Sequence, residues 1–394
     1  MDSTEALQSS EWDFENVETD YLTHNFHSYP AKFIPQIPNK VINTYSKEGD
    51  VVLDPFCGCG GALVEAKLLG CHSIGVDINP LACLITKVKV TPISASPLGQ
   101  LDNLLSKIEM DINSAYGQAR LFHSGKPRYE VFSFYNIDKW FQKHVQKELA
   151  IIRGNIDSVN DKDLKDFCLV AFSSIINRVS NMESETRYAC VSKKIAPKKT
   201  FELFQAKLKN MASRMREFAL RCKDVRADVY CADARKLDFL KDGSIDLVVT
   251  SPPYIYAWDY NLIHRFRLFW LSYSREYIID LQNKEIGSHL RLERKQKAAN
   301  DPSVAVNDYV SDMSQALSEM SRVCKNGAMC CTVLGSSQLE GKKIEIDKIL
   351  IDVARKCDFK LENRFIRVIN PKRKATNIAF ARIRREHVLL FRKI

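Results

Sequence analysis

The chain has 394 residues, and its 58 Lys and Arg against 48 Asp and Glu give a formal net charge of +10. Hydrophobic residues make up 45% and charged residues 27%, values that exclude a disordered or fibrous chain and fit one large domain or two to three smaller ones. Seven acids and no Lys or Arg in residues 1–20 are not the pattern of a secretory or transit peptide, and no apolar run approaches the roughly 18 residues of a membrane span. We therefore expect an intracellular protein with no membrane contact, cytoplasmic if its source is prokaryotic.

Twelve cysteines are scattered along the chain, mostly within apolar stretches. Without an export signal, this usage indicates reduced thiols and not a disulfide framework. The closest pairs, Cys57/Cys59 and Cys330/Cys331, lack the spacing and the second matching pair of a zinc site, so no metal site is predicted. The basic excess fits a phosphate-rich partner.

Residues 51–77 are typical of a strand, a glycine-rich loop, a helix and a second strand. A short apolar run ends at Asp54, the loop 54–61 reads Asp-Pro-Phe-Cys-Gly-Cys-Gly-Gly, and a helical stretch closes at Gly70. The next strand, residues 73–77, ends in Asp77, 19 residues after Gly58. This order predicts the first half of a doubly wound nucleotide-binding sheet.

The glycine loop differs from a dinucleotide fingerprint because Leu63 stands at the third glycine position. A hydride-transfer function therefore lacks its main support. Closely spaced glycines still let a ligand approach the backbone, and a carboxylate at the end of the following strand suits ribose hydroxyls. A purely structural turn is the less favoured interpretation, because Asp54 and Asp77 both stand at strand ends.

About 130 residues separate the second strand from the third, far more than a crossover helix needs. We expect an inserted domain or lobe there. Its pattern is mostly helical, with helices predicted at residues 137–152, 164–179 and 201–222, and residues 187–199 hold five cations and no acid. Both features make the insertion a candidate for nucleic-acid contact.

Later strands are predicted at residues 228–230, 245–250, 328–333, 365–368 and 387–391, the last two close enough to form a hairpin at the sheet edge. A second interruption, residues 255–307, precedes a helix at residues 309–324.

Residues 250–254 read Thr-Ser-Pro-Pro-Tyr directly after an apolar strand. Two prolines cannot continue a ladder, so the strand ends in a stiff loop at the carboxyl edge, where α/β sheets bind ligands. Ser251 and the Pro252 carbonyl could accept hydrogen bonds from an exocyclic amine, and Tyr254 could stack on a planar base. A simple turn is the less favoured alternative.

Together the two motifs resemble those of the S-adenosylmethionine-dependent DNA amino-methyltransferases. Asp-Pro-Phe-Cys-Gly-Cys-Gly is similar to their cofactor motif, and Ser-Pro-Pro-Tyr to their catalytic motif in its N4-cytosine form, adenine-N6 members usually having Asp or Asn in place of Ser251. The resemblance spans about residues 24–92 and 226–394. It implies an α/β, Rossmann-like class I methyltransferase fold with a seven-stranded, mostly parallel sheet. The chain's own pattern adds a helical insertion at 93–225 and an acidic segment at 1–23.

The resemblance also implies S-adenosylmethionine as the cofactor. Residues 24–33 are similar to the segment that closes over the methionine end of the cofactor, and Asp233 ends the third strand, where the family binds the adenine amino group. Asp is also a common helix N-cap, which is the structural alternative for Asp233. The expected cofactor contacts are Tyr29, Asp54, Phe56, Gly58, Gly60, Asp77 and Asp233, and the expected catalytic residues are Ser251, Pro252, Pro253 and Tyr254.

Basic clusters are the candidates for DNA contact. Related enzymes usually place target recognition after or just before the catalytic motif, whereas the large insertion here falls between the second and third strands. Both the insertion and residues 255–307 are therefore candidates for sequence recognition. Residues 364–385 add eight cations without an acid. A solvated face is the alternative for each cluster, although phosphate contacts would position a duplex without reading it. The expected contacts are Arg187, Lys193, Lys194, Arg291, Arg294, Lys372, Arg373 and Lys374.

The implied reaction is transfer of a methyl group from S-adenosylmethionine to N4 of cytosine in double-stranded DNA, by base flipping and direct transfer. A C5-cytosine enzyme needs a Pro-Cys pair, which the chain lacks. Adenine-N6 methylation, guanine-N2 methylation of structured RNA and a noncatalytic nucleic-acid-binding module are the alternatives. A cognate restriction endonuclease is a candidate partner, and the oligomeric state is not predicted.

Overall fold

The protein is described from a computed structural model, which covers residues 12–30, 32–117, 129, 132–185, 187–255, 259–301, 303–335, 337–339, 342–369 and 385–394. Its centre is a seven-stranded sheet in the order β3-β2-β1-β4-β5-β9-β8. The strands are β1 (Val51–Asp54), β2 (His72–Asp77), β3 (Ala227–Cys231), β4 (Ile245–Thr250), β5 (Cys324–Gly335), β8 (Phe359–Val368) and β9 (Arg385–Lys393). A separate two-stranded sheet joins β6 (Ser337–Leu339) to β7 (Lys342–Ile344).

All strand pairs from β3 to β5 are parallel, and β9 runs antiparallel between β5 and β8. The predicted class I methyltransferase sheet is thus confirmed, including the antiparallel pairing at its edge. Alternate residues of each strand face opposite sides, as a strand requires. Leu53 and Val248 join the core under the helices α14 (Ser303–Val323) and α15 (Ile346–Lys356), whereas Val52 and Val249 join the core under α2 (Gln36–Tyr45) and α3 (Gly61–Leu68).

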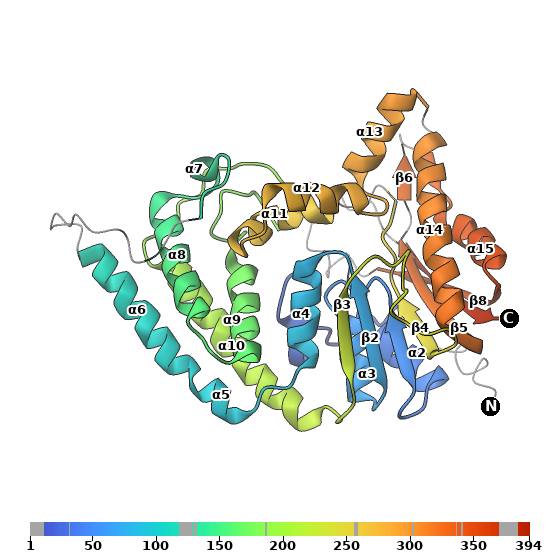
Figure 1. Ribbon diagram of the computed structural model, residues 1–394, viewed down its shortest axis with the longest axis horizontal. Coiled ribbons are helices and arrows are strands. Elements are labelled where there is room, and N and C mark those ends of the chain that lie inside the picture. The colour runs from blue at the N-terminus through green and yellow to red at the C-terminus, as the bar shows by residue number, and fades with distance from the viewer. Residues whose placement is uncertain are drawn as a thin grey trace.

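Helices cover both faces (Figure 1). Before β3 they are η1 (Leu22–Asn25), α2 (Gln36–Tyr45), α3 (Gly61–Leu68), α4 (Pro80–Val90), α5 (Ala95–Gly99), α6 (Leu101–Gly117), α7 (Ile137–Trp140), α8 (Lys143–Asp157), α9 (Lys162–Ile175) and α10 (Lys199–Arg221). After β4 they are α11 (Tyr260–Trp270), α12 (Arg275–Lys284), α13 (His289–Ala299), α14 (Ser303–Val323) and α15 (Ile346–Lys356). In the described part of the chain, no helix is long and apolar enough to cross a membrane.

The helix predicted at residues 137–152 is wrong, because the structure breaks it into α7 and α8. Phe141 stands at the break with extended backbone angles, φ −136° and ψ 128°. Its ring is buried and makes edge contacts with Phe266 and Trp270 of α11. An aromatic anchor of this kind outweighs local helix preference, which is a weak determinant of structure.

The helices of residues 93–225 share one apolar core with the sheet's own helices. Leu63 of α3 and Ile85 of α4 belong to the same buried cluster as Phe167 of α9 and Phe204 of α10. In Figure 1 the insertion helices lie to the left of the sheet, and α11 and α12 lie across its upper end. The insertion is therefore firmly joined to the side of the sheet.

Candidate functional site

A pocket opens at the carboxyl edge of the sheet. The loops that follow β1, β2, β3 and β4 line it, together with the segment that precedes α2. The structure brings seven of the predicted residues to its wall: Tyr29, Phe56, Gly58, Asp77, Asp233, Ser251 and Pro253. Asp54, Gly60, Pro252 and Tyr254 are one or two residues from these in the chain but do not line the pocket.

The glycine loop takes a shape that only glycine fits. Gly58 and Gly60 have positive φ angles of 48° and 74°. A Cβ on Gly60 would lie 2.6 Å from Thr86 Cγ2, and one on Gly58 would lie 3.2 Å from the ring of Tyr29. The Gly58 N–H donates to Asp77 Oδ2 at 3.0 Å. The loop and the end of β2 are therefore held together as one wall.

Two carboxylates stand at the ends of β1 and β2. Asp54 is only 1% exposed, and its Oδ1 accepts from Thr250 Oγ1 at 2.6 Å and from the Phe56 N–H at 3.2 Å. Its Oδ2 has no hydrogen-bond partner among the described residues. Burial raises the pKa of Asp54 to about 7 and that of Asp77 to about 6. Each is an acceptor that a bound cation or donor would stabilise.

Asp233 lies at the pocket wall beyond β3. Arg235 donates two hydrogen bonds to its carboxylate, with Nε 3.0 Å from Oδ1 and Nη2 2.6 Å from Oδ2. Burial acts to raise the pKa of Asp233, but these bonds outweigh it and hold that pKa below its usual range. Asp233 is thus a fixed, charged acceptor with lone pairs to spare.

The loop after β4 presents Ser251 to the pocket. Its Oγ donates to the Val333 carbonyl at 3.1 Å, which leaves the oxygen lone pairs available to accept. The Tyr309 hydroxyl donates to the Pro253 carbonyl at 3.0 Å and stiffens the loop. Tyr254 is 4% exposed, with its hydroxyl 3.2 Å from Ser251 Oγ and 3.4 Å from Glu386 Oε1. In this conformation its ring offers no free face.

The sequence prediction missed the wall of the pocket that α11 and α12 provide. Tyr260, Asn261 and Glu285 line it. Glu285 is buried, accepts from the Tyr260 N–H at 2.8 Å and from Asn261 Nδ2 at 2.9 Å, and has its pKa raised by burial to about 8. The Tyr29 ring stacks on those of Tyr260 and His264, with centroids 5.9 and 4.9 Å away. No motif marks these residues, since only the fold brings them to the pocket.

The predicted DNA contacts of the insertion lie in different surroundings. Arg187 is exposed and pairs with Glu183 at 2.9 Å. Lys194 is exposed, and Lys193 is half-buried with Nζ 3.4 Å from the Asn177 carbonyl.

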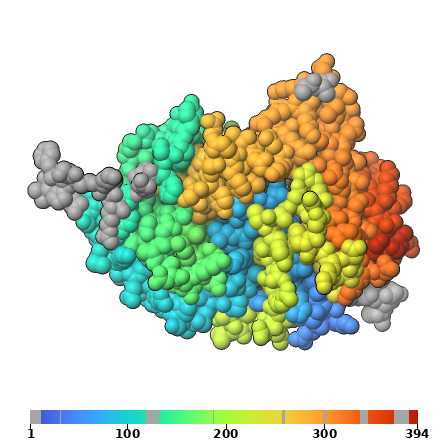
Figure 2. All heavy atoms as spheres, in the orientation of Figure 1, coloured from blue at the N-terminus to red at the C-terminus, as the bar shows by residue number. Residues whose placement is uncertain are grey.

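Beyond β4, Arg291 is 11% exposed in its side chain and is held by Asp308 and Asp312 at 2.8 Å each. Arg294 bonds Asn283 at 3.3 Å. Both belong to α13, which projects from the body in Figure 2. Lys372, Arg373 and Lys374 lie outside the described residues.

Among the described residues, no three His, Cys, Asp or Glu side chains gather as metal ligands would.

Comparison with known proteins relates the chain to DNA-modifying enzymes. Residues 3–88 match a family described as DNA methylase. The Type II methyltransferase M.MvaI of Kocuria varians is 33% identical over 258 residues, which cover 61% of this chain and 55% of that protein. The Type II methyltransferase M.MjaII of Methanocaldococcus jannaschii is 24% identical over 381 residues, 76% of this chain and 71% of that protein.

The chain is similar to the DNA methylase family over residues 3–88 and to Type II methyltransferases over a longer stretch. It spans about half the length of M.MvaI. A shorter match joins it to the tRNA (guanine(10)-N2)-dimethyltransferase of Methanocaldococcus jannaschii, 39% identical over 75 residues, 19% of this chain and 21% of that protein. S-adenosylmethionine is the cofactor of the DNA amino-methyltransferases. The pocket fits that cofactor, because its wall carries the Asp77 carboxylate beside a glycine loop in which Gly58 and Gly60 have positive φ angles and little room for a Cβ.

Proposed function

We propose that this protein methylates the exocyclic N4 amine of cytosine in double-stranded DNA. The observation that carries the proposal is the position of Ser251, an available acceptor directly after β4, in the same pocket as the glycine loop after β1 and Asp77 of β2. The chain thereby places an amine acceptor beside a candidate cofactor site at one edge of the sheet.

Several residues would hold the cofactor. Asp77 suits the ribose hydroxyls, and Asp54 would hold the glycine loop in place through its bonds with Thr250 and the Phe56 N–H. Phe56, Gly58 and Gly60 shape the loop, Asp233 offers an acceptor to the adenine amino group, and Tyr29 closes the opposite side. When bound, S-adenosylmethionine supplies an electrophilic methyl group on a positively charged sulfur.

The loop 251–254 would bind the target base and orient its amine. A cytosine amine is a poor nucleophile because its lone pair delocalises into the ring. Ser251 Oγ and the Pro252 carbonyl, by accepting both amine hydrogens, would favour a tetrahedral nitrogen whose lone pair is free to attack. Pro253 keeps the loop rigid. The base must leave the helix stack, which costs a few kcal/mol, and stacking on Tyr254 would offset part of this. Because the Tyr254 ring is buried, this role requires it to move when DNA binds.

The basic residues of the insertion and of α13 would contact phosphates. Exposed Arg187 and Lys194 are suited to this, whereas Arg291 first has to leave two aspartates. Since Type II methyltransferases are among the relatives, a restriction endonuclease with the same target is the partner we propose.

Adenine-N6 methylation is the second candidate, because the same loop geometry would serve either amine. Ser251 in place of Asp or Asn favours cytosine. Guanine-N2 methylation of RNA ranks below both, since the match to the tRNA enzyme covers 19% of the chain.

Transfer of tritium from methyl-labelled S-adenosylmethionine tests the activity. We expect label in plasmid duplex DNA and none in structured RNA. Label in RNA alone would favour guanine-N2 methylation of RNA over DNA methylation. Cofactor binding without any labelled product would indicate a noncatalytic nucleic-acid-binding module. Ser251→Ala is the matched control, because label that persists with this variant would come from a contaminating enzyme.

A further inference from the structure

A second cavity adjoins the candidate pocket on the side of the insertion. It has a volume of about 360 Å³ and shares Tyr29 and Pro30 with that pocket. Its other walls are Ser28 and a stretch that follows α9, namely Asn177, Arg178, Ser184, Glu185 and Lys193. The cavity therefore lies where the insertion meets the segment that precedes the glycine loop.

The charge of this cavity is positive. Arg178 and Lys193 are its two cations, and its one lining acid, Glu185, is ion-paired with the buried Arg267 behind the wall. Arg178 makes no side-chain hydrogen bond or ion pair with another described residue. Lys193 has one long contact, 3.4 Å to the Asn177 carbonyl, and burial lowers its pKa. Two cations with so little compensation favour an anion between them.

The uncharged groups of the cavity fit the same ligand. Ser184 Oγ accepts from the Arg187 N–H at 3.1 Å, so its own proton is left for another acceptor. Asn177 is 2% exposed, and its Oδ1 lacks a partner among the described residues. A buried amide oxygen of this kind needs a donor such as an ordered water. The lining thus offers an anion the Ser184 hydroxyl beside its two cations.

We propose that this second cavity binds a backbone phosphate of the DNA close to the target base, with Arg178 and Lys193 as its cations. The proposal rests on the proposed function. A polyanion is favoured over a free anion because the exposed cations Arg187 and Lys194 lie beside the lining residues Glu185 and Lys193 in the chain. Its shared wall at Tyr29 and Pro30 places the bound phosphate beside the pocket that also contains Ser251, so the insertion would fix the position of the strand.

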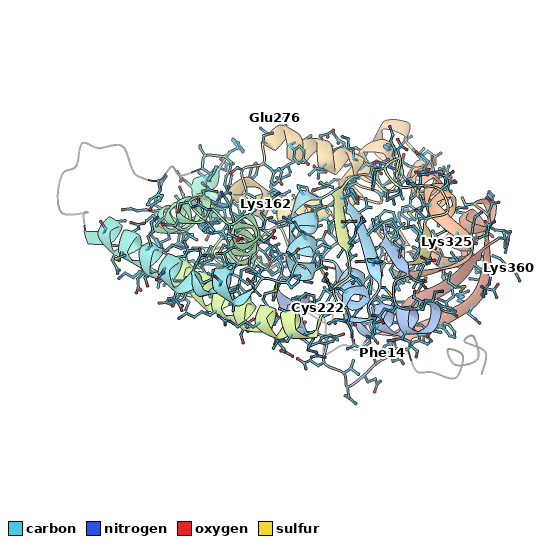
Figure 3. The ribbon with its side chains drawn as sticks, turned by 60° about the horizontal axis from the view of Figure 1, so that its bottom comes forward. Phe14, Lys162, Cys222, Glu276, Lys325 and Lys360 are labelled. Carbon is cyan, nitrogen blue, oxygen red and sulfur yellow. The ribbon has the colours of Figure 1, made fainter. Side chains whose placement is uncertain are left out.

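Salt-dependent DNA binding tests this proposal. Arg178→Gln/Lys193→Gln should weaken binding of a 30-base-pair duplex about tenfold and flatten the slope of log affinity against log salt by about 0.9, the value for one phosphate contact. The control Lys162→Gln/Lys209→Gln removes the same charge from exposed positions away from the cavity. Lys162, labelled in Figure 3, begins α9 and lies at the opposite end of that helix from Asn177. The control should keep the parent slope.

Unchanged affinity for S-adenosylmethionine shows that the double variant is folded. A parent slope in that folded variant would overturn the proposal. A second result would also overturn it: the parent protein binds inorganic phosphate in calorimetry, the double variant does not, and yet the salt slope of DNA binding is the same in both. The cavity would then hold a free anion and not a DNA phosphate. The measurement needs no methyl transfer: the flattened slope in a protein that methylates no base would support the phosphate site and contradict the proposed function alone. Failure of the parent protein to bind duplex DNA would contradict both.

Discussion

Thr250, the last residue of β4, donates from its Oγ1 to Asp54, the last residue of β1, at 2.6 Å. The two strands are neighbours, with Leu53 in register with Val248. This single bond ties the start of the glycine loop to the start of the Ser-Pro-Pro-Tyr loop. The candidate cofactor site and the candidate base site are therefore held in one relative position by the ends of two strands.

Thr250→Val should disturb both loops. It leaves Asp54 Oδ1 with only the Phe56 N–H, and an unsatisfied buried carboxylate costs about 1–3 kcal/mol. We expect a lower free energy of unfolding in urea and weaker S-adenosylmethionine binding. Thr250→Ser keeps the hydroxyl and should preserve both, and if the valine variant also preserves them the bond is dispensable.

Asp77→Ala should weaken S-adenosylmethionine binding tens-fold or more, because a charged contact to the ribose is worth about 1.5–3 kcal/mol. Calorimetric titration measures this. The control is Asp228→Ala, which removes an acid of β3 that pairs with Arg226 and does not line the pocket. Equal affinities for Asp77→Ala and the parent would refute the assignment.

Ser251→Ala should act on turnover. The acceptor is most valuable as the amine nitrogen becomes tetrahedral, so kcat should fall on the order of a hundredfold while S-adenosylmethionine affinity stays normal. Ser244→Ala, in a surface turn, should leave kcat unchanged. The assignment fails if Ser251→Ala methylates at the parent rate or loses cofactor binding while folded.

Two variants of Tyr254 should separate the role of its ring from the role of its hydroxyl. Tyr254→Phe keeps the stacking face and should bind duplex DNA normally, whereas Tyr254→Ala should lose about 1–3 kcal/mol of DNA affinity. Cofactor binding should survive in both. Because the ring is buried, an unfolding curve has to show that the alanine variant is folded. Equal DNA affinity for the folded alanine variant and the parent would remove Tyr254 from base capture.

Glu285 should make stability depend on pH. Burial raises the pKa of its folded-state carboxyl from 4.5 to about 8, so the folded protein holds a proton that the unfolded chain releases. Its contribution is fully present below pH 4.5 and is lost as pH rises through 8. Glu285→Gln should therefore lose less unfolding free energy between pH 5 and pH 8 than the parent. Identical losses would show that Glu285 does not titrate in this way.

The sequence alone was sufficient to predict the sheet and its two motifs. Strands such as residues 245–250 are short, apolar and closed by prolines, so local chemistry determines where they end. The break at Phe141 and the pocket wall at Glu285 were not predictable in this way. Both depend on contacts with α11, whose Phe266 is 125 residues from Phe141 and whose Tyr260 is 25 residues from Glu285. The burial of Tyr254 is likewise set by Glu386, 132 residues away.

The identity of the methylated nucleoside tests the central claim most directly. Unmethylated plasmid DNA, treated with the protein and S-adenosylmethionine, would be digested to nucleosides and analysed by mass spectrometry. We predict N4-methyldeoxycytidine, absent when Ser251→Ala replaces the parent protein. N6-methyldeoxyadenosine, or no methylated nucleoside from a protein that binds S-adenosylmethionine, would contradict cytosine-N4 methylation.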